Sequence, residues 1–66
     1  MSGPTYESME MLGMAADTLD NLYGALQLPI PAQMHVEQMK AQLPLLRDKL
    51  RAIYVIETGD NPWESA

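Results

Sequence analysis

Hydrophobic residues recur along this chain of 66 residues in two stretches, each with the three- and four-residue spacing of an amphipathic helix. In the first stretch they are Met9, Leu12, Ala16, Leu19, Tyr23 and Leu26. In the second they are Val36, Met39, Leu43, Leu46, Leu50 and Ile53. The segment LPIP, residues 28–31, lies between them, and each proline disfavours helix at the residue before it. The pattern therefore predicts two helices, over about residues 5–27 and about residues 31–57, joined by a turn over 28–31.

Residues typical of helix ends agree with these limits. Pro4 and Pro31 suit the first turns of the two helices, because proline fixes the backbone angle that a helix start needs. The candidate caps of the first helix are Ser2, Gly3 and Thr5. Gly59 is a typical helix end, and it leaves an acidic tail over residues 58–66.

The two helices match in register if the chain folds back at about residues 29 and 30. The pairs that then face each other are Met9 with Leu50, Ala16 with Leu43, and Tyr23 with Val36. The two hydrophobic stripes match in register across one short turn, and this agreement strengthens the prediction of both helices. We therefore predict an all-α fold, an antiparallel helical hairpin that forms a single domain over residues 1–66.

Each predicted helix also carries a second group of hydrophobic residues, away from its seam. The group comprises Met34, Ala41, Leu45, Ala52 and Ile56 in the second helix. In the first helix the corresponding set is Met11 and Leu22, with Ala15, Thr18 and Ala25 beside them. A lone hairpin buries one stripe of each helix, so this side is expected to be exposed, and exposed apolar surface marks an interface. Two hairpins can pair through it into a dimeric four-helix bundle, or it can bind a different protein. We expect a homodimer, with another protein as a further partner.

Pro44 lies inside the second predicted helix. It removes one backbone hydrogen bond and crowds the carbonyl of Lys40, so a bend is expected there. A bend that improves packing is the simpler interpretation, and a functional hinge or a water-filled notch is the alternative.

The charge pattern bears on the partner. The net charge of −5 argues against nucleic acid as the main partner, since phosphate binding needs clustered lysine and arginine. The acidic face of the first helix comprises Glu7, Glu10, Asp17 and Asp20, and it is either solvated or a recognition surface for a basic partner. In the second helix, Lys40, Arg47 and Arg51 share one face, which keeps a nucleic-acid regulator as the alternative.

Catalytic and metal chemistry find little support in the residue types present. The chain has no cysteine and a single histidine, which excludes disulfides and a closed zinc site of the usual kind within one chain. No nucleophile–base pair and no glycine-rich phosphate loop stands out. We therefore expect no enzyme activity, no cofactor, no metal and no small-molecule substrate. No apolar run approaches the about 18–20 residues of a membrane span, so we also expect a cytoplasmic protein with no membrane partner.

The tail contains Trp63, the one tryptophan of the chain. One interpretation is that the tail folds back over the end of the helices, near Tyr6 or Tyr54. The other is that a short motif binds another protein, because tryptophan is a favoured interface anchor. The motif comprises Asp60, Asn61, Pro62 and Trp63.

The predicted arrangement resembles the plasmid copy-number regulators of the Rop type, in which a short helical hairpin with an acidic tail dimerises into a four-helix bundle. In that family basic residues of the first helix bind RNA, whereas the first helix here has no lysine or arginine. In size the chain is similar to small helical-hairpin chaperones of bacterial secretion systems and to phage-encoded inhibitors of host proteins. We therefore predict a non-enzymatic homodimer that binds another protein as a regulator, a phage- or plasmid-encoded inhibitor, or a chaperone. The alternative is a Rop-like nucleic-acid-binding regulator that uses the basic face of the second helix.

Overall fold

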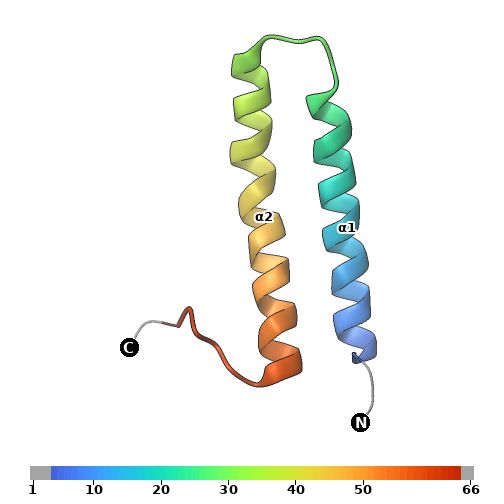
Figure 1. The fold of residues 1–66 in the computed structure, drawn as a ribbon, viewed down its shortest axis with the longest axis vertical. Coiled ribbons are helices and arrows are strands. Elements are labelled where there is room, and N and C mark those ends of the chain that lie inside the picture. Colours follow the sequence, from blue (N-terminus) through green and yellow to red (C-terminus); the bar gives the residue numbers. More distant parts are fainter. Residues whose placement is uncertain (1–3, 65–66) are drawn as a thin grey trace.

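The protein is an antiparallel hairpin of two helices in a computed structural model that describes residues 4–64 (Figure 1). Helix α1 spans Tyr6–Leu26 and α2 spans Ala32–Thr58, so both begin and end within one residue of the predicted limits. Within residues 4–64 there is no strand. The all-α hairpin predicted from the sequence is therefore confirmed.

Local side-chain chemistry explains where the helices start and stop. Thr5 caps α1, and its Oγ1 accepts a hydrogen bond from the backbone N–H of Ser8 at 3.1 Å. Pro31 immediately precedes α2. Gly59 ends α2 with φ at +73°, a left-handed conformation that glycine adopts without a steric penalty, and its N–H reaches the Val55 carbonyl at 2.8 Å. The other predicted cap candidates, Ser2 and Gly3, lie outside the described residues.

The hairpin is a flat slab with overall dimensions of 47 × 30 × 12 Å. Its smallest dimension equals the diameter of about one helix with its side chains. The tail after Gly59 runs out beside α2, on the side away from α1 (Figure 1). Both broad sides of the slab are therefore open to contact over most of their length.

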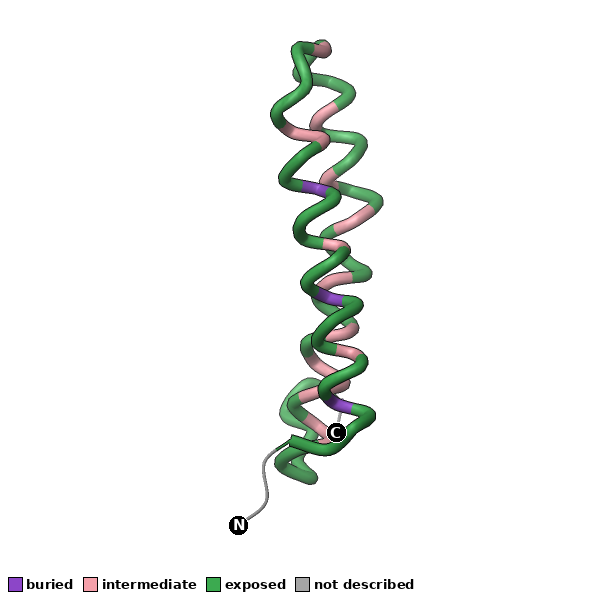
Figure 2. The backbone as a smooth tube through the Cα atoms, turned by 90° about the vertical axis from the view of Figure 1, so that its right-hand side faces the viewer, coloured by how far each residue is buried: buried purple, intermediate pink, exposed green. Residues whose placement is uncertain are grey.

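A contact line of less exposed residues, spaced by three and four, marks where each helix faces the other (Figure 2). On α1 this contact line comprises Ser8, Met11, Ala15, Thr18, Leu22 and Ala25. On α2 it comprises His35, Met39, Gln42, Leu46, Lys49, Ile53 and Ile56. Among the described residues only Ala15 and Leu22 are fully buried hydrophobic side chains, with 2% and 5% of their surface exposed. The core within one chain is therefore very small.

The predicted seam of the first helix is wrong. Met9, Leu12, Leu19 and Tyr23 are exposed, and the line that faces α2 is the one predicted to point outward. On α2, Met39, Leu46 and Ile53 face α1 as predicted, whereas Val36, Leu43 and Leu50 are exposed. The physical reason is that the contact line includes polar residues, namely Ser8, Thr18, His35, Gln42 and Lys49. The most hydrophobic stripe of each helix is thus not the one that the hairpin covers.

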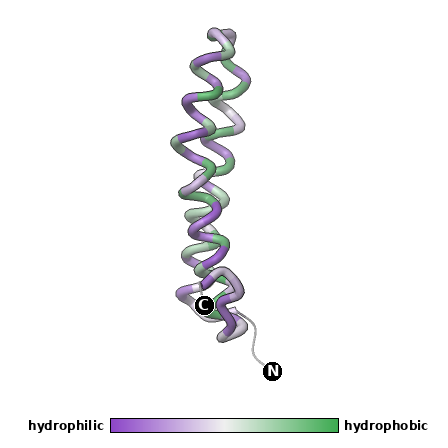
Figure 3. The backbone as a smooth tube through the Cα atoms, turned by 90° about the vertical axis from the view of Figure 1, so that its left-hand side faces the viewer, coloured by the Kyte–Doolittle hydropathy of each residue, from purple (hydrophilic) through white to green (hydrophobic). Residues whose placement is uncertain are grey.

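These exposed residues all lie on one broad side of the slab, which we call the apolar side. It comprises Met9, Leu12, Ala16, Leu19 and Tyr23 of α1 and Val36, Leu43 and Leu50 of α2. At about 100° per residue, both groups lie roughly a quarter turn from the contact line in the same rotational sense. Because the helices run in opposite directions, that rotation turns both groups to the same side. Hydrophobic positions accordingly recur turn after turn along the slab (Figure 3).

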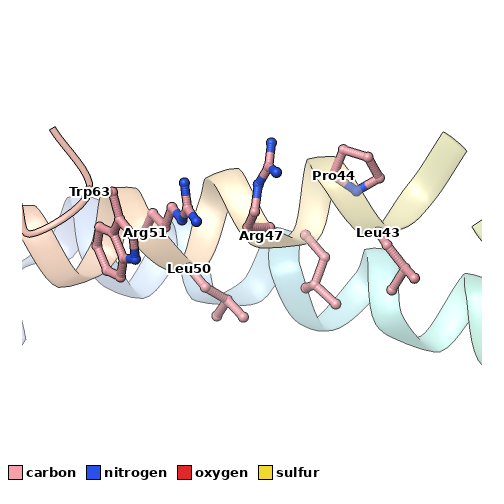
Figure 4. Close-up of a pocket in the computed structure, with 7 residues that line it drawn as sticks. Leu43, Pro44, Arg47, Leu50, Arg51 and Trp63 are labelled. Carbon is pink, nitrogen blue, oxygen red and sulfur yellow. The ribbon is translucent and has the colours of Figure 1, made fainter. Parts of the chain in front are cut away.

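Pro44 is accommodated within a continuous α2. Its ring is exposed and lies on the edge of α2 away from α1 (Figure 4). The carbonyl of Lys40, which loses its usual partner to the proline, is therefore on the solvent side of the helix, where water can bind it.

Neither helix in the described part of the chain combines the length and the hydrophobicity that crossing a membrane requires.

Candidate functional site

The apolar side holds a groove along α2 (Figure 4). Leu43 and Leu50 point to the same side of the helix, and Trp63 closes one end of the groove beside Arg51 (Figure 4). The complete lining comprises Leu43, Pro44, Leu46, Arg47, Leu50, Arg51 and Trp63. A second hollow lies on α1, lined by Ala16, Leu19, Asp20 and Tyr23. Both helices therefore offer an apolar depression on the same side.

Along each helix, exposed and buried hydrophobic positions alternate. This is the pattern of a helix-bundle seam in which one half contacts the other helix of the hairpin and the other half is exposed. On α1 the heptad positions Leu12, Ala15, Leu19 and Leu22 alternate between exposed and buried. On α2, Leu43 and Leu50 are exposed, while Met39, Leu46 and Ile53 are half-buried. In a four-helix bundle each helix contacts two neighbours and buries both halves of such a seam. The hairpin supplies one of those two neighbours.

Charges of opposite sign border the apolar side. Asp20 lies on the outer edge of α1, away from α2, and this helix carries no base. Lys40, Arg47 and Arg51 lie along the outer edge of α2, next to the apolar side. The one ion pair among the described residues joins Arg47 to the adjacent Asp48 at 3.1 Å, with both side chains well exposed. Such a pair contributes little, so these bases remain available to a partner.

The tail folds back onto the last turns of α2, as the first of the two interpretations expects. The Trp63 ring meets the Tyr54 ring edge-on, with centroids 5.3 Å apart, and the guanidinium carbon of Arg51 lies 4.9 Å from the Trp63 ring centroid. Asn61 Oδ1 accepts from the Trp63 N–H at 3.2 Å, and Thr58 Oγ1 accepts from the Asp60 N–H at 3.1 Å. Trp63 is still 42% exposed, so it both packs on the helix and presents surface. A binding role for the tail residues, Pro62 included, stays a prediction.

We expect Trp63→Ala to lower the free energy of unfolding by about 1–2 kcal/mol, from the lost ring packing and the lost cation–π contact. Trp63→Phe should retain most of this stability, because a phenyl ring still packs on Tyr54. The measurement is urea unfolding followed by circular dichroism at one fixed protein concentration. Equal unfolding midpoints for Trp63→Ala and the wild type would mean that the tail does not pack on α2 in solution.

The opposite broad side, which we call the acidic side, carries mixed chemistry. Its members are Glu7, Glu10, Met14, Asp17 and Asn21 of α1, with Met34, Gln38, Ala41, Leu45 and Asp48 of α2. All of them are exposed, and so is Asp20 on the outer edge. Acids here surround a few hydrophobic side chains, of which Leu45 and Met14 lie at about the same level.

The residues predicted to form the outward apolar face are therefore divided by the structure. Met34, Ala41 and Leu45 are exposed as predicted, on the acidic side. Met11, Leu22 and Ile56 lie instead on the contact line between the helices, and Ala52 is half-buried in a hollow that the tail also lines. These residues were misplaced because the wrong stripe of α1 was predicted to face α2. The residues predicted to point outward from α1 are therefore the ones that face α2.

A hydrogen-bonded cluster that the sequence analysis missed ties the two ends of the chain together. Glu57 of α2 accepts hydrogen bonds at Oε2 from the N–H and Oγ1 of Thr5, at 3.1 and 3.2 Å, and from the buried Ser8 hydroxyl. The hydrogen bond from Ser8, followed by that from the Thr5 backbone, lowers the pKa of the Glu57 carboxyl below its ordinary value. The carboxylate also lies at the positive end of the α1 dipole. The signal that could have revealed it is the hairpin register, which brings the end of α2 beside the start of α1.

We expect Glu57→Gln to lower the urea midpoint at neutral pH, because the neutral amide is a weaker acceptor for these three donors. Since the folded pKa is lowered, the carboxylate stabilises the fold fully above the ordinary value of 4.5, and this contribution is lost as the pH falls through the folded pKa. The difference between wild type and variant should therefore shrink in acid. Glu10→Gln, on the acidic side, is the matched control and should leave the midpoint nearly unchanged. A difference that persists undiminished in acid would contradict this assignment.

Within residues 4–64, no group of three or more histidine, aspartate and glutamate side chains is placed to hold a metal ion. His35 is half-buried on the contact line, away from the two open sides. None of the family models, curated proteins and solved structures with which the chain was compared matches it. The candidate functional surfaces are therefore the two open sides of the hairpin.

Proposed function

We propose that this protein is a non-enzymatic helical hairpin that self-associates through its apolar side into a homodimeric four-helix bundle, and that the dimer acts by binding another protein as a regulator, inhibitor or chaperone. The observation that carries the proposal is the small core, since Ala15 and Leu22 are the only fully buried hydrophobic side chains among the described residues. A chain of 66 residues needs a disulfide, a metal or a partner to supplement such a core. It has no cysteine.

The accessible surface area of the single chain is large enough to include an interface with a second copy. The chain has 5089 Å² of accessible surface, whereas a compact monomer of 7.4 kDa exposes about 4200 Å². The excess of about 900 Å² is close to the roughly 800 Å² that one partner contributes to a standard interface. Pairing through the apolar side would remove Leu12, Leu19, Leu43 and Leu50 from water.

In such a dimer the acidic side of each copy stays exposed, so the bundle has one acidic side on each of its two outer surfaces. Its carboxylates, Glu7, Glu10, Asp17 and Asp48, surround Met14 and Leu45. This chemistry suits a protein partner that presents hydrophobic side chains among lysine or arginine residues, because opposite charges steer association and contact with apolar groups adds affinity. The sequence-predicted residues Met34, Ala41 and Leu45 thus keep a role, as part of a surface for another protein.

The test compares proteins retained from a cell extract by immobilised wild-type protein, by Leu45→Glu and by the charge-reversed Glu10→Lys. The proposal expects a protein that binds the wild type and is lost with both variants. As a control, Gln33→Glu on the outer edge of α2 adds a charge outside the acidic side and should retain that protein. A set of retained proteins that is the same for all variants would contradict the assignment of the acidic side.

A nucleic-acid regulator is the second candidate, favoured by the row of Lys40, Arg47 and Arg51 on one edge of α2. The test is a gel shift with short RNA and DNA duplexes at low salt, where phosphate contacts are strongest. Binding that is lost with Arg47→Ala and weakened by salt would favour this candidate. No shift at low salt would exclude it.

A further inference from the structure

The apolar side can meet a second copy about a twofold axis in two ways. With the axis parallel to the helices, α1 of each copy lies on α2 of the other. If the axis instead runs across the helices, α1 lies on α1 and α2 lies on α2. Both arrangements make every stacked pair antiparallel, so the direction of the helices does not choose between them.

Hydrophobic packing does not choose between them either. Met9 and Tyr23 are equally spaced about Ala16, and Val36 and Leu50 are equally spaced about Leu43. Ala16 and Leu43 lie at about the same level of the hairpin, so the apolar side has nearly the same pattern in both directions. The charged residues on the outer edges of the helices are therefore needed to distinguish the two arrangements.

The charges favour the axis parallel to the helices. An axis across the helices would place Lys40 beside Arg47 of the second copy, and all bases on one edge of the bundle. The parallel axis instead lays the outer edge of α1, with Asp20, on the basic edge of α2. Asp20 then lies at the level of Lys40 of the second copy.

The open space beside Gly13, on the outer edge of α1, also favours the axis parallel to the helices. Gly13 has no atom within 4 Å of the place where a Cβ would stand. In the parallel arrangement it lies at the level of Arg47 of the second copy, whose long side chain then crosses α1 without a steric obstacle. The groove of Figure 4, with two arginines on its border, is then occupied by a helix that carries acids and no base.

We propose that α1 of a second copy of this chain fills the α2 groove between Leu43 and Trp63, about a twofold axis parallel to the helices. This arrangement rests on the self-association proposed above and specifies how the two copies meet. Each dimer then has two identical α1–α2 contacts, and the two folded tails lie at the same end of the bundle.

Two single-cysteine variants, Ala16→Cys and Leu43→Cys, test this arrangement, because the chain has no cysteine of its own. The parallel axis places position 16 against position 43 of the second copy, at a separation suited to a disulfide. Mild oxidation should therefore give covalent dimers in a mixture of the two variants and not with either variant alone. Covalent dimers from Ala16→Cys alone would establish the other axis and overturn the proposal, as would the absence of covalent dimers from the mixture. Ala41→Cys, on the acidic side, is the control and should give none.

Reversing the charge of Lys40 is an independent test, because the two arrangements predict opposite changes in the dimer dissociation constant. With the parallel axis, Lys40→Asp should raise the dimer dissociation constant about two- to fivefold, and the double variant Asp20→Lys with Lys40→Asp should restore it. With the axis across the helices, Lys40→Asp would relieve repulsion and lower the dissociation constant. If the wild-type chain sediments as a monomer throughout, the self-association itself fails, which is distinguishable from a dimer with the wrong axis.

Discussion

Leu43→Glu is expected to convert the protein from a dimer into a monomer, with the dimer dissociation constant rising by roughly 100-fold or more. Leu43 lies at the middle of the apolar side and is 47% exposed in the isolated chain. In the proposed bundle it is covered by the second copy, so a carboxylate there loses its water without gaining a partner. Both copies carry the change, which doubles its effect on the dimer. Analytical ultracentrifugation of wild type and variant measures the two dissociation constants.

Leu45→Glu is the matched control for this experiment. Leu45 belongs to the same helix two residues away, and it is 49% exposed, so the two leucines are almost equally accessible in one chain. It lies on the acidic side, which the proposed dimer leaves free. We therefore expect the variant to keep the wild-type mass. A dimer that survives Leu43→Glu but dissociates with Leu45→Glu would place the self-association surface on the side that the sequence analysis predicted.

Leu22→Ala is expected to lower the free energy of unfolding by about 2–5 kcal/mol, which is a large fraction of the stability of a small domain. Leu22 is 5% exposed and lies on the contact line between α1 and α2. Its truncation leaves a cavity that two packed helices cannot readily close. Urea unfolding followed by circular dichroism measures the change.

Two controls accompany Leu22→Ala. Leu28→Ala, in the loop between the helices, removes an equal number of atoms from an exposed position and should cost well under half as much. Leu19→Ala, on the apolar side, should be destabilising only to the extent that the dimer is populated, so its effect should depend on protein concentration. If Leu22→Ala and Leu28→Ala unfold at the same urea concentration, Leu22 does not lie between the helices.

The sequence predicted the helices and their ends because these depend on local chemistry. The cap at Thr5, the prolines in the turn and the glycine after α2 each act within a few residues of where they stand. Spacing along the chain is likewise sufficient to show that both helices are amphipathic. The antiparallel hairpin follows from the short connection.

The sequence could not show which stripe of α1 faces α2, because two stripes lie about a quarter turn apart and both are hydrophobic. Choosing the more hydrophobic one placed Leu12 and Leu19 inside and Leu22 outside, the reverse of what the structure shows. A bundle core needs both stripes, since one faces the helix of the same chain and the other is available to a further helix. The Glu57 cluster was missed for a related reason, because it joins residues about fifty positions apart.

In the proposed dimer, a second copy of the chain covers the apolar side of the hairpin. Sedimentation equilibrium of the wild-type protein over a dilution series measures this self-association. We expect a mass of twice 7.4 kDa at high concentration, with dissociation on dilution accompanied by loss of helical signal. A fully helical species of 7.4 kDa at every concentration would show that the apolar side is not covered by a second copy.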